Sequence, residues 1–195
     1  MPTLKSQCAT RAARGERIIV KINTPLAARP KIGAAFPLNA EKSMDLILWR
    51  HAEAEEGVPD LERALTGKGH KQARRVGDWL GNQMPDSCRI IVSPALRTLQ
   101  TAEALGRKFK IHKDLAPGAA PDEVLLAANW PGAKESVLVI GHQPTLGQVA
   151  ALLLAGEELD WELRKAGVWW FSQREAGDAA STYLKAVMGP DLIVK

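Results

Sequence analysis

Cysteine is scarce in this 195-residue sequence, which contains only Cys8 and Cys88. Two cysteines cannot build a disulfide framework, and no Cys-x-x-Cys pair is present to bind zinc. We therefore expect a reducing, cytoplasmic location. Long apolar runs are missing as well: the longest covers residues 149–155, far short of the ~20 residues of a membrane-spanning helix. We expect no membrane partner.

A strong excess of one charge is also missing from most of the chain. The net charge is +4, but residues 1–43 contain eight basic and two acidic residues, so residues 44–195 carry −2. The basicity that would indicate nucleic-acid binding is thus confined to the N-terminal segment. The six tryptophans are scattered along the chain and do not suggest a surface for stacking bases. We expect no nucleic-acid partner.

The N-terminal 43 residues differ in character from the rest of the chain. They contain four prolines and one short β-like run, residues 17–22, which is a weak basis for an independent domain. Three explanations remain open: translation that starts at Met44, a processed targeting peptide, or a disordered arm. We favour the start at Met44, because it immediately precedes the first good strand. Whether residues 1–43 belong to the mature protein is left open.

From Met44 onward, segments typical of strands and helices alternate. Buried strands are predicted at 45–49, 89–92 and 136–140, a shorter one at 110–113, and a final pair at 167–172 and 181–187. Helices are predicted at 67–80 with Thr66 as N-cap, and at 94–109, 121–130 and 146–154. This alternation predicts an α/β fold with a mainly parallel sheet covered on both faces.

Histidines and arginines follow the three most confident strands. Arg50 and His51 come directly after the first strand, and Arg97 lies one helical turn beyond the second. His142 follows the strand at 136–140. Because ligands of open α/β sheets bind beyond the carboxyl ends of the strands, we expect these four side chains to meet at one edge.

This set of side chains has a definite chemistry. The guanidinium group of arginine donates two parallel hydrogen bonds to an oxyanion and stays charged at any working pH. Two such groups suit a phosphate dianion. A neutral histidine beside them can attack phosphorus and hold the phosphoryl group covalently. A second histidine, if protonated, would add positive charge where negative charge spreads during transfer. We expect no metal or cofactor, because the arginines supply the positive charge.

Four segments, in matching order and spacing, resemble the histidine phosphatase superfamily, and its SixA-type phosphohistidine phosphatase branch in particular. They are Arg50-His51-Ala52-Glu53, Leu65-Thr66-x-x-Gly69-x-x-Gln72-Ala73, Ser93-Pro94-x-x-Arg97-Thr98-x-Gln100-Thr101-Ala102 and Gly141-His142. The resemblance covers residues 44–188. It implies a three-layer α/β/α sandwich of the phosphoglycerate mutase-like type, formed by residues 44–195.

The resemblance also implies residue roles. His51 would be the phosphorylated nucleophile, and Arg50, Arg97 and His142 would form the phosphate pocket. The implied activity is a phosphohistidine phosphatase that acts on a phosphorylated protein. Two alternatives stay open: a phosphatase of small phosphorylated metabolites from the same superfamily, and a phosphohistidine-binding module without turnover.

Two departures from the family pattern matter. Ala52 stands where many members carry glycine, a change that we expect to be tolerated. Larger relatives use a glutamate in a longer insertion as proton donor, and no such insertion appears between Phe109 and Pro121. The nearby carboxylates are those of Asp114, Asp122 and Glu123, for which helix capping is the simpler role. A missing acid would suit phosphohistidine, because an imidazole can leave already protonated.

Overall fold

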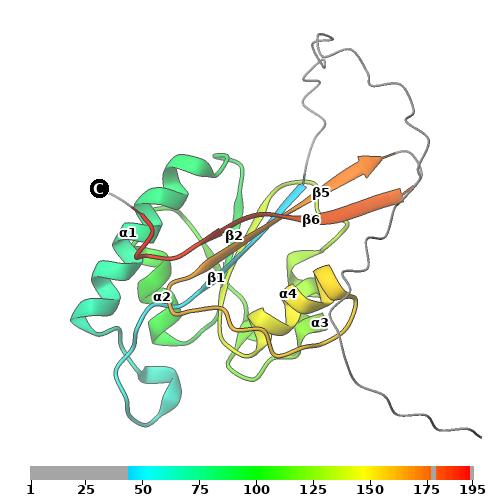
Figure 1. Ribbon diagram of the computed structural model, residues 1–195. Coiled ribbons are helices and arrows are strands. Elements are labelled where there is room, and N and C mark those ends of the chain that lie inside the picture. Colours follow the sequence, from blue (N-terminus) through cyan, green and yellow to red (C-terminus); the bar gives the residue numbers. More distant parts are fainter. Residues whose placement is uncertain (1–43, 177–178, 194–195) are drawn as a thin grey trace, which may run out of the picture. The chain divides into compact units, whose positions relative to one another are not determined.

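Residues 44–176 and 179–193 are described by the computed structural model of the protein (Figure 1), and the expectations for residues 1–43 lie outside them. The strands are β1 (Met44–Arg50), β2 (Arg89–Val92), β3 (Lys110–Ile111), β4 (Val137–Gly141), β5 (Val168–Ala176) and β6 (Ala179–Met188). The α-helices are α1 (Gly67–Gln83), α2 (Leu96–Glu103), α3 (Pro121–Ala128) and α4 (Thr145–Ala155), and the 3-10 helices are η1 (Asp60–Glu62) and η2 (Lys113–Leu115).

The six strands form one sheet in the order β3-β2-β4-β1-β5-β6. Strands β3, β2, β4 and β1 pair in parallel, and β5 and β6 add an antiparallel edge. Helices α1 and α2 cover one face of the sheet, and α3 and α4 cover the other (Figure 1). The predicted three-layer α/β/α sandwich with a mainly parallel sheet is confirmed.

Strand β1 is apolar at successive positions because it is buried on both faces. Ile47 and Trp49 pack into the core under α1 and α2, and Leu46 and Leu48 pack into the core under α3 and α4. Successive side chains of a strand point to opposite faces, so a central strand covered on both sides needs an unbroken apolar run. The same holds for β4, which is buried at every position.

Two helices illustrate what local sequence determines. Helix α1 begins where predicted, and the Thr66 side chain accepts a hydrogen bond from the amide of Gly69 at 2.9 Å. Helix α2 is shorter than the predicted span of 94–109, because its N-cap is Ala95 and it ends at Glu103. Beyond it the chain turns through Gly106, whose φ of +68° is a left-handed conformation that glycine adopts without strain.

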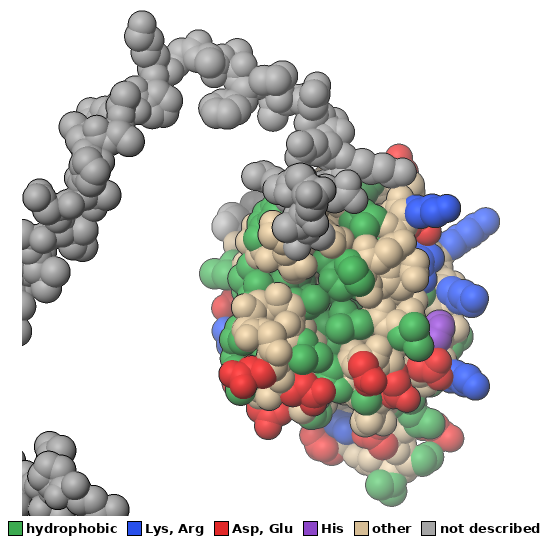
Figure 2. Space-filling model, turned by 90° about the vertical axis from the view of Figure 1, so that its right-hand side faces the viewer, with side chains coloured by type: hydrophobic (Ala, Val, Ile, Leu, Met, Phe, Trp, Pro, Cys, Tyr) green, Lys and Arg blue, Asp and Glu red, His purple; other side chains and the backbone are tan. Residues whose placement is uncertain are grey.

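The last two strands run longer than predicted and pair antiparallel, with an irregularity in register between Trp170 and Phe171. Figure 2 shows the side of the domain on which α3 and α4 lie, where acidic side chains form a band and basic ones appear mainly at one edge. Among the described residues, no helix is long and apolar enough to cross a membrane.

Candidate active site

The sheet register brings the two histidines together. Strands β1 and β4 are parallel neighbours, and Arg50 is paired with Gly141, so His51 and His142 leave the sheet side by side. Their rings lie 5.2 Å apart between centroids, with planes tilted by 53°. Strand β2 lies on the other side of β4 and leads through Ser93 into α2, which carries Arg97. The predicted meeting of these side chains at one sheet edge is what the structure shows.

His51 is held as a neutral ring with one nitrogen free for attack. Its Nδ1 lies 2.7 Å from the carbonyl oxygen of Ala52, and because a carbonyl only accepts, Nδ1 carries the hydrogen. The pKa of His51 is lowered to about 4, first of all by burial and then by the charges of Arg97 and Arg50, which together outweigh the raising effect of the hydrogen bond to Ala52. At neutral pH, Nε2 therefore has an unprotonated lone pair.

His142 is also neutral. Burial lowers the pKa of its ring to about 3, helped by the neighbouring charges of His51 and Arg97. In the free protein the condition that the second histidine be protonated is therefore not met at neutral pH, because a buried ring beside cations resists gaining charge. Its Nε2 lies 2.7 Å from Ser93 Oγ, which accepts the amide of Ala95 at 3.4 Å. When the Ser93 hydroxyl donates to Nε2, the ring hydrogen of His142 lies on Nδ1.

Two buried hydrogen-bonding atoms in this cluster lack partners. Among the described residues, Nδ1 of His142 and Nε of Arg50 are buried without a hydrogen bond. Arg50 uses Nη1 to donate to the carbonyl of Leu163 at 2.8 Å, which fixes the guanidinium in place. Buried polar atoms are paired in the great majority of cases, so such exceptions need an explanation. A bound oxyanion would accept from Arg50 Nε, and from His142 Nδ1 when that nitrogen carries the ring hydrogen.

Arg97 is fixed by a carboxylate that sequence reasoning missed. The guanidinium donates from Nη1 to the carbonyl oxygen of Asp60 at 2.6 Å and from Nη2 to its carboxylate at 2.8 Å. Arg63 donates to the other carboxylate oxygen at 3.0 Å. These hydrogen bonds, from Arg97 first and Arg63 second, lower the pKa of Asp60. In the sequence, Asp60 and Arg63 are visible only as opposite charges shortly before Leu65-Thr66. The folded loop is what brings Asp60 into contact with Arg97.

The polar residues of the matched segments hold the loop that follows His51. Three side chains accept hydrogen bonds from loop amides: Thr101 from Ala52 at 3.1 Å, Gln100 from Leu65 at 2.7 Å and Gln72 from Glu53 at 3.1 Å. Gly69 lets the loop approach α1, because a Cβ there would lie 1.9 Å from the carbonyl oxygen of Glu53. These residues frame the site and explain the spacing of the segments.

The three carboxylates considered as proton donors have other contacts. Glu123 accepts from the amide of Ala120 at 2.8 Å, and Asp122 accepts from the amide of Glu123 at 3.0 Å, so both cap α3. Asp114 lies in η2, with its carboxylate 3.7 Å from Nδ1 of His112. No group of three His, Cys, Asp or Glu side chains in the described part of the chain is arranged to hold a metal ion.

The family model and the similar proteins indicate the same family for this chain. Residues 46–119 match the model of the histidine phosphatase superfamily (branch 1). Phosphohistidine phosphatase SixA of Escherichia coli (strain K12) is 32% identical over 123 residues, which are 58% of this chain and 76% of that protein. A SixA homolog of Haemophilus influenzae is 30% identical over 126 residues, 56% of this chain and 77% of that protein. The chain belongs to the histidine phosphatase superfamily.

Solved structures agree with this membership. The protein histidine phosphatase SixA complexed with tungstate superposes with a TM-score of 0.62 at 27% identity, covering 76% of this chain and 98% of that one. A putative phosphohistidine phosphatase SixA from Nakamurella multipartitia gives a TM-score of 0.60 at 27% identity, over 76% and 96% of the two chains. As in these superfamily members, a central sheet carries helices on both faces.

Proposed function

We propose that residues 44–195 form a phosphohistidine phosphatase domain, in which His51 accepts a phosphoryl group and water then removes it. The observation that carries this proposal is the pair of unpartnered buried nitrogens, Arg50 Nε and His142 Nδ1, in the cluster with the neutral His51 ring. A phosphoryl group at this position would satisfy both nitrogens and meet the nucleophile. The guanidinium of Arg97 supplies further positive charge for its oxygens.

In the first step, the lone pair on His51 Nε2 attacks phosphorus. A P–N bond forms to His51 while the P–N bond of the substrate breaks, and its electron pair stays on the departing imidazole. Because His51 Nδ1 keeps its hydrogen through the bond to Ala52, the phosphorylated ring carries a positive charge. A positively charged ring is a good leaving group, so this hydrogen bond supports the second step as well.

In the second step, water attacks the phosphoryl group. The oxygen of water bonds to phosphorus, the P–Nε2 bond breaks, and the electron pair returns to His51. The released proton stays with inorganic phosphate. Arg50, Arg97 and His142 are the residues to which we assign stabilisation of the charge on the phosphoryl oxygens in both steps.

The state of Asp60 supports phosphohistidine over a phosphate ester as substrate. Arg97 and Arg63 lower the pKa of Asp60, so the carboxylate that is bonded to Arg97 is ionised and has no proton to give. An alkoxide leaving group needs a proton donor, whereas an imidazole protonated on its other nitrogen does not. The similarity to SixA, one structure of which holds the oxyanion tungstate, supports the same substrate class. A phosphorylated carrier protein of a cytoplasmic signalling or phosphotransfer system is the substrate we expect.

Turnover of two substrate types tests this proposal. A peptide phosphorylated on histidine and glucose 6-phosphate are supplied to the full chain, and kcat/KM is measured by release of inorganic phosphate. We expect the phosphopeptide to be hydrolysed faster by about 100-fold, the smaller end of what a general acid contributes. Faster hydrolysis of the sugar phosphate would contradict the proposed substrate. Tight binding of phosphopeptide without any release would instead indicate a binding module.

A further inference from the structure

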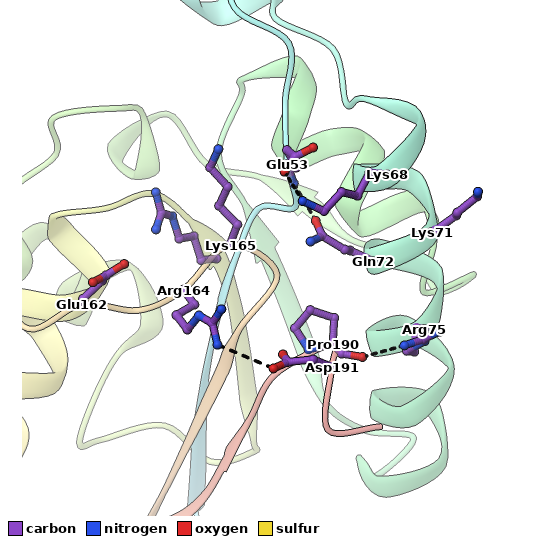
Figure 3. A pocket seen from close by; sticks show the side chains of 11 residues that line it. Glu53, Lys68, Lys71, Gln72, Arg75, Glu162, Arg164, Lys165, Pro190 and Asp191 are labelled. Carbon is purple, nitrogen blue, oxygen red and sulfur yellow. Dashed lines mark hydrogen bonds and ion pairs between the residues drawn. The ribbon is translucent and has the colours of Figure 1, made fainter. Parts of the chain in front are cut away.

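An open groove of about 660 Å³ leads away from the active site along α1. Its lining includes Arg50 and Glu53, which precede and follow His51 in the sequence, and it runs between α1 and the loop that precedes β5 (Figure 3). Its far end is closed by the chain after β6. The lining residues are Arg50, Glu53, Lys68, Lys71, Gln72, Arg75, Glu162, Arg164, Lys165, Pro190 and Asp191.

The charge of this α1 groove is opposite to that of the domain around it. Its lining has six basic and three acidic residues, a net charge of +3, whereas residues 44–195 carry −2. Glu53 neutralises Lys68 at 2.8 Å, and Asp191 lies 3.6 Å from Arg164. Arg75 and Lys165 are exposed, as is the neighbouring Lys71. On the side seen in Figure 2, acidic side chains form a band and basic ones gather mainly at one edge.

The cations of the groove are spread out along a line. Lys68, Lys71, Gln72 and Arg75 recur at the spacing of one helix face, which covers about 10 Å at 1.5 Å per residue. Arg164 and Lys165 face α1 from the opposite wall (Figure 3). A site for one phosphate has donors that converge on a point, whereas this row of charges fits an elongated anion. The row is continuous with Arg50, so an anion lying in it extends away from the reacting phosphoryl group.

We propose that the α1 groove docks an acidic stretch of the phosphorylated protein next to its phosphohistidine. This inference rests on the proposed function and adds to it the specificity for acidic sequence around the target histidine. Complementary charges of this kind steer a partner into register and raise the rate of association more than the final affinity.

The lining favours a polypeptide over a nucleic acid or a small molecule. None of the eleven residues is aromatic, whereas single-stranded nucleic acids bind by stacking on aromatic rings. Glu53, Glu162 and Asp191 lie among the basic residues of the lining, so its positive charge is discontinuous and fits spaced carboxylates better than an unbroken run of phosphates. Small ligands bind in pockets that enclose most of their surface, which the exposed cations of this groove do not.

Two histidine-phosphorylated peptides test the proposal, one with three glutamates on each side of the phosphohistidine and one with glutamines there. Both are given to the full chain and to the variant Arg75→Glu/Lys165→Glu. The matched control is Arg74→Glu/Lys134→Glu, which makes the same charge change at exposed residues outside the groove. We expect the wild type to favour the glutamate peptide about tenfold in kcat/KM. The groove variant loses this preference, and the control keeps it.

The outcomes separate the two proposals. Equal kcat/KM for both peptides in the wild type would overturn docking of acidic sequence while leaving the phosphatase intact. Hydrolysis of neither peptide would mean that the proposed function has failed. Binding of a labelled 20-nucleotide RNA that only the groove variant loses, together with equal peptide rates, would overturn the proposal in favour of a nucleic acid.

Discussion

The catalytic cluster and the α1 groove share Arg50 but use positive charge in opposite ways. In the cluster, Arg97 is 4% exposed and its guanidinium makes two hydrogen bonds to Asp60. In the groove, Lys165 is exposed to solvent on a loop. The comparison leads us to expect that geometry controls the proposed buried site, where each donor has a fixed direction, and that charge controls the proposed docking groove.

Burial also determines how strongly the charges of each region shift the pKa values of nearby groups. The buried histidines have pKa values lowered to about 4 for His51 and about 3 for His142, first of all by desolvation. Exposed charges are screened by water and salt over about 8–10 Å at physiological ionic strength. We therefore expect substitutions in the cluster to change chemistry, and substitutions in the groove to change encounter with the substrate.

The largest difference between the two regions is expected when arginine and lysine are exchanged. Arg97→Lys keeps the charge but loses the planar fork, so we expect kcat on a phosphohistidine peptide to fall about 100-fold. Lys165→Arg in the groove keeps the charge in an open place, and we expect kcat/KM within about twofold of wild type. Steady-state kinetics of both variants checks this. Equal effects of the two exchanges would remove the distinction between geometry and charge.

Two glycines in the first turn of α1 extend the comparison to stability. Gly69→Ala places a Cβ against the Glu53 carbonyl of the active-site loop, whereas Gly67→Ala meets nothing within 4 Å. We expect Gly69→Ala to lower the free energy of unfolding by about 1–3 kcal/mol through overpacking. Gly67→Ala is the matched control, with a small gain in stability. Urea unfolding measures both, and a Gly69→Ala protein as stable as Gly67→Ala would show that the loop is not held closely.

The lowered histidine pKa values predict a pH dependence of stability. The unfolded chain binds protons near the ordinary histidine pKa of 6.5, and folded His51 does so only near 4. The unfolded state therefore holds more protons between these values, and stability falls as the pH drops through this window. We expect a loss of about 1–2 kcal/mol per histidine from pH 7 to pH 5. In His142→Gln the loss should be smaller, and an unchanged loss in urea unfolding would contradict these pKa shifts.

Removal of the Asp60 charge is expected to have the smallest effect. Its carboxylate is 51% exposed and holds the Arg97 guanidinium that phosphate oxygens would contact. Asp60→Asn should therefore strengthen inhibition by inorganic phosphate by about two- to fivefold, the range of an exposed ion pair. Glu56→Gln, which removes a 91% exposed partner of Arg63, is the control. Weaker inhibition in Asp60→Asn would show that the carboxylate helps to bind phosphate.

The arrangement of the fold was predictable because its signals are local. Apolar runs such as residues 45–49, and Thr66 as a helix cap, are determined by nearby sequence, and strand–helix alternation then restricts the topology. The spatial meeting of His51 with His142 was also predictable, since both follow parallel strands of one sheet. The end of α2 was not, because the apolar spacing typical of a helix continues beyond Glu103 although the helix stops there and the chain turns at Gly106.

Three features could not be predicted from the sequence, because they depend on where loops lie in the fold and on which groups become buried. Asp60 contacts Arg97 across 37 positions of sequence, and no periodicity relates the two. The neutral state of His142 follows from desolvation in the finished core, which a list of neighbouring charges cannot supply. The α1 groove was missed for a similar reason: α1 is basic, with four lysines and arginines against one aspartate, but only the fold sets it opposite Arg164 and Lys165 of the loop before β5.

Trapping the phosphorylated protein tests the central claim most directly. The full chain is mixed with a histidine peptide carrying labelled phosphate, quenched in alkali within milliseconds, and digested for mass spectrometry. The account predicts a label that is stable in alkali and labile in acid, attached to Nε2 of His51, and absent from His51→Ala together with turnover. A label on another residue, or turnover that persists in His51→Ala, would contradict it.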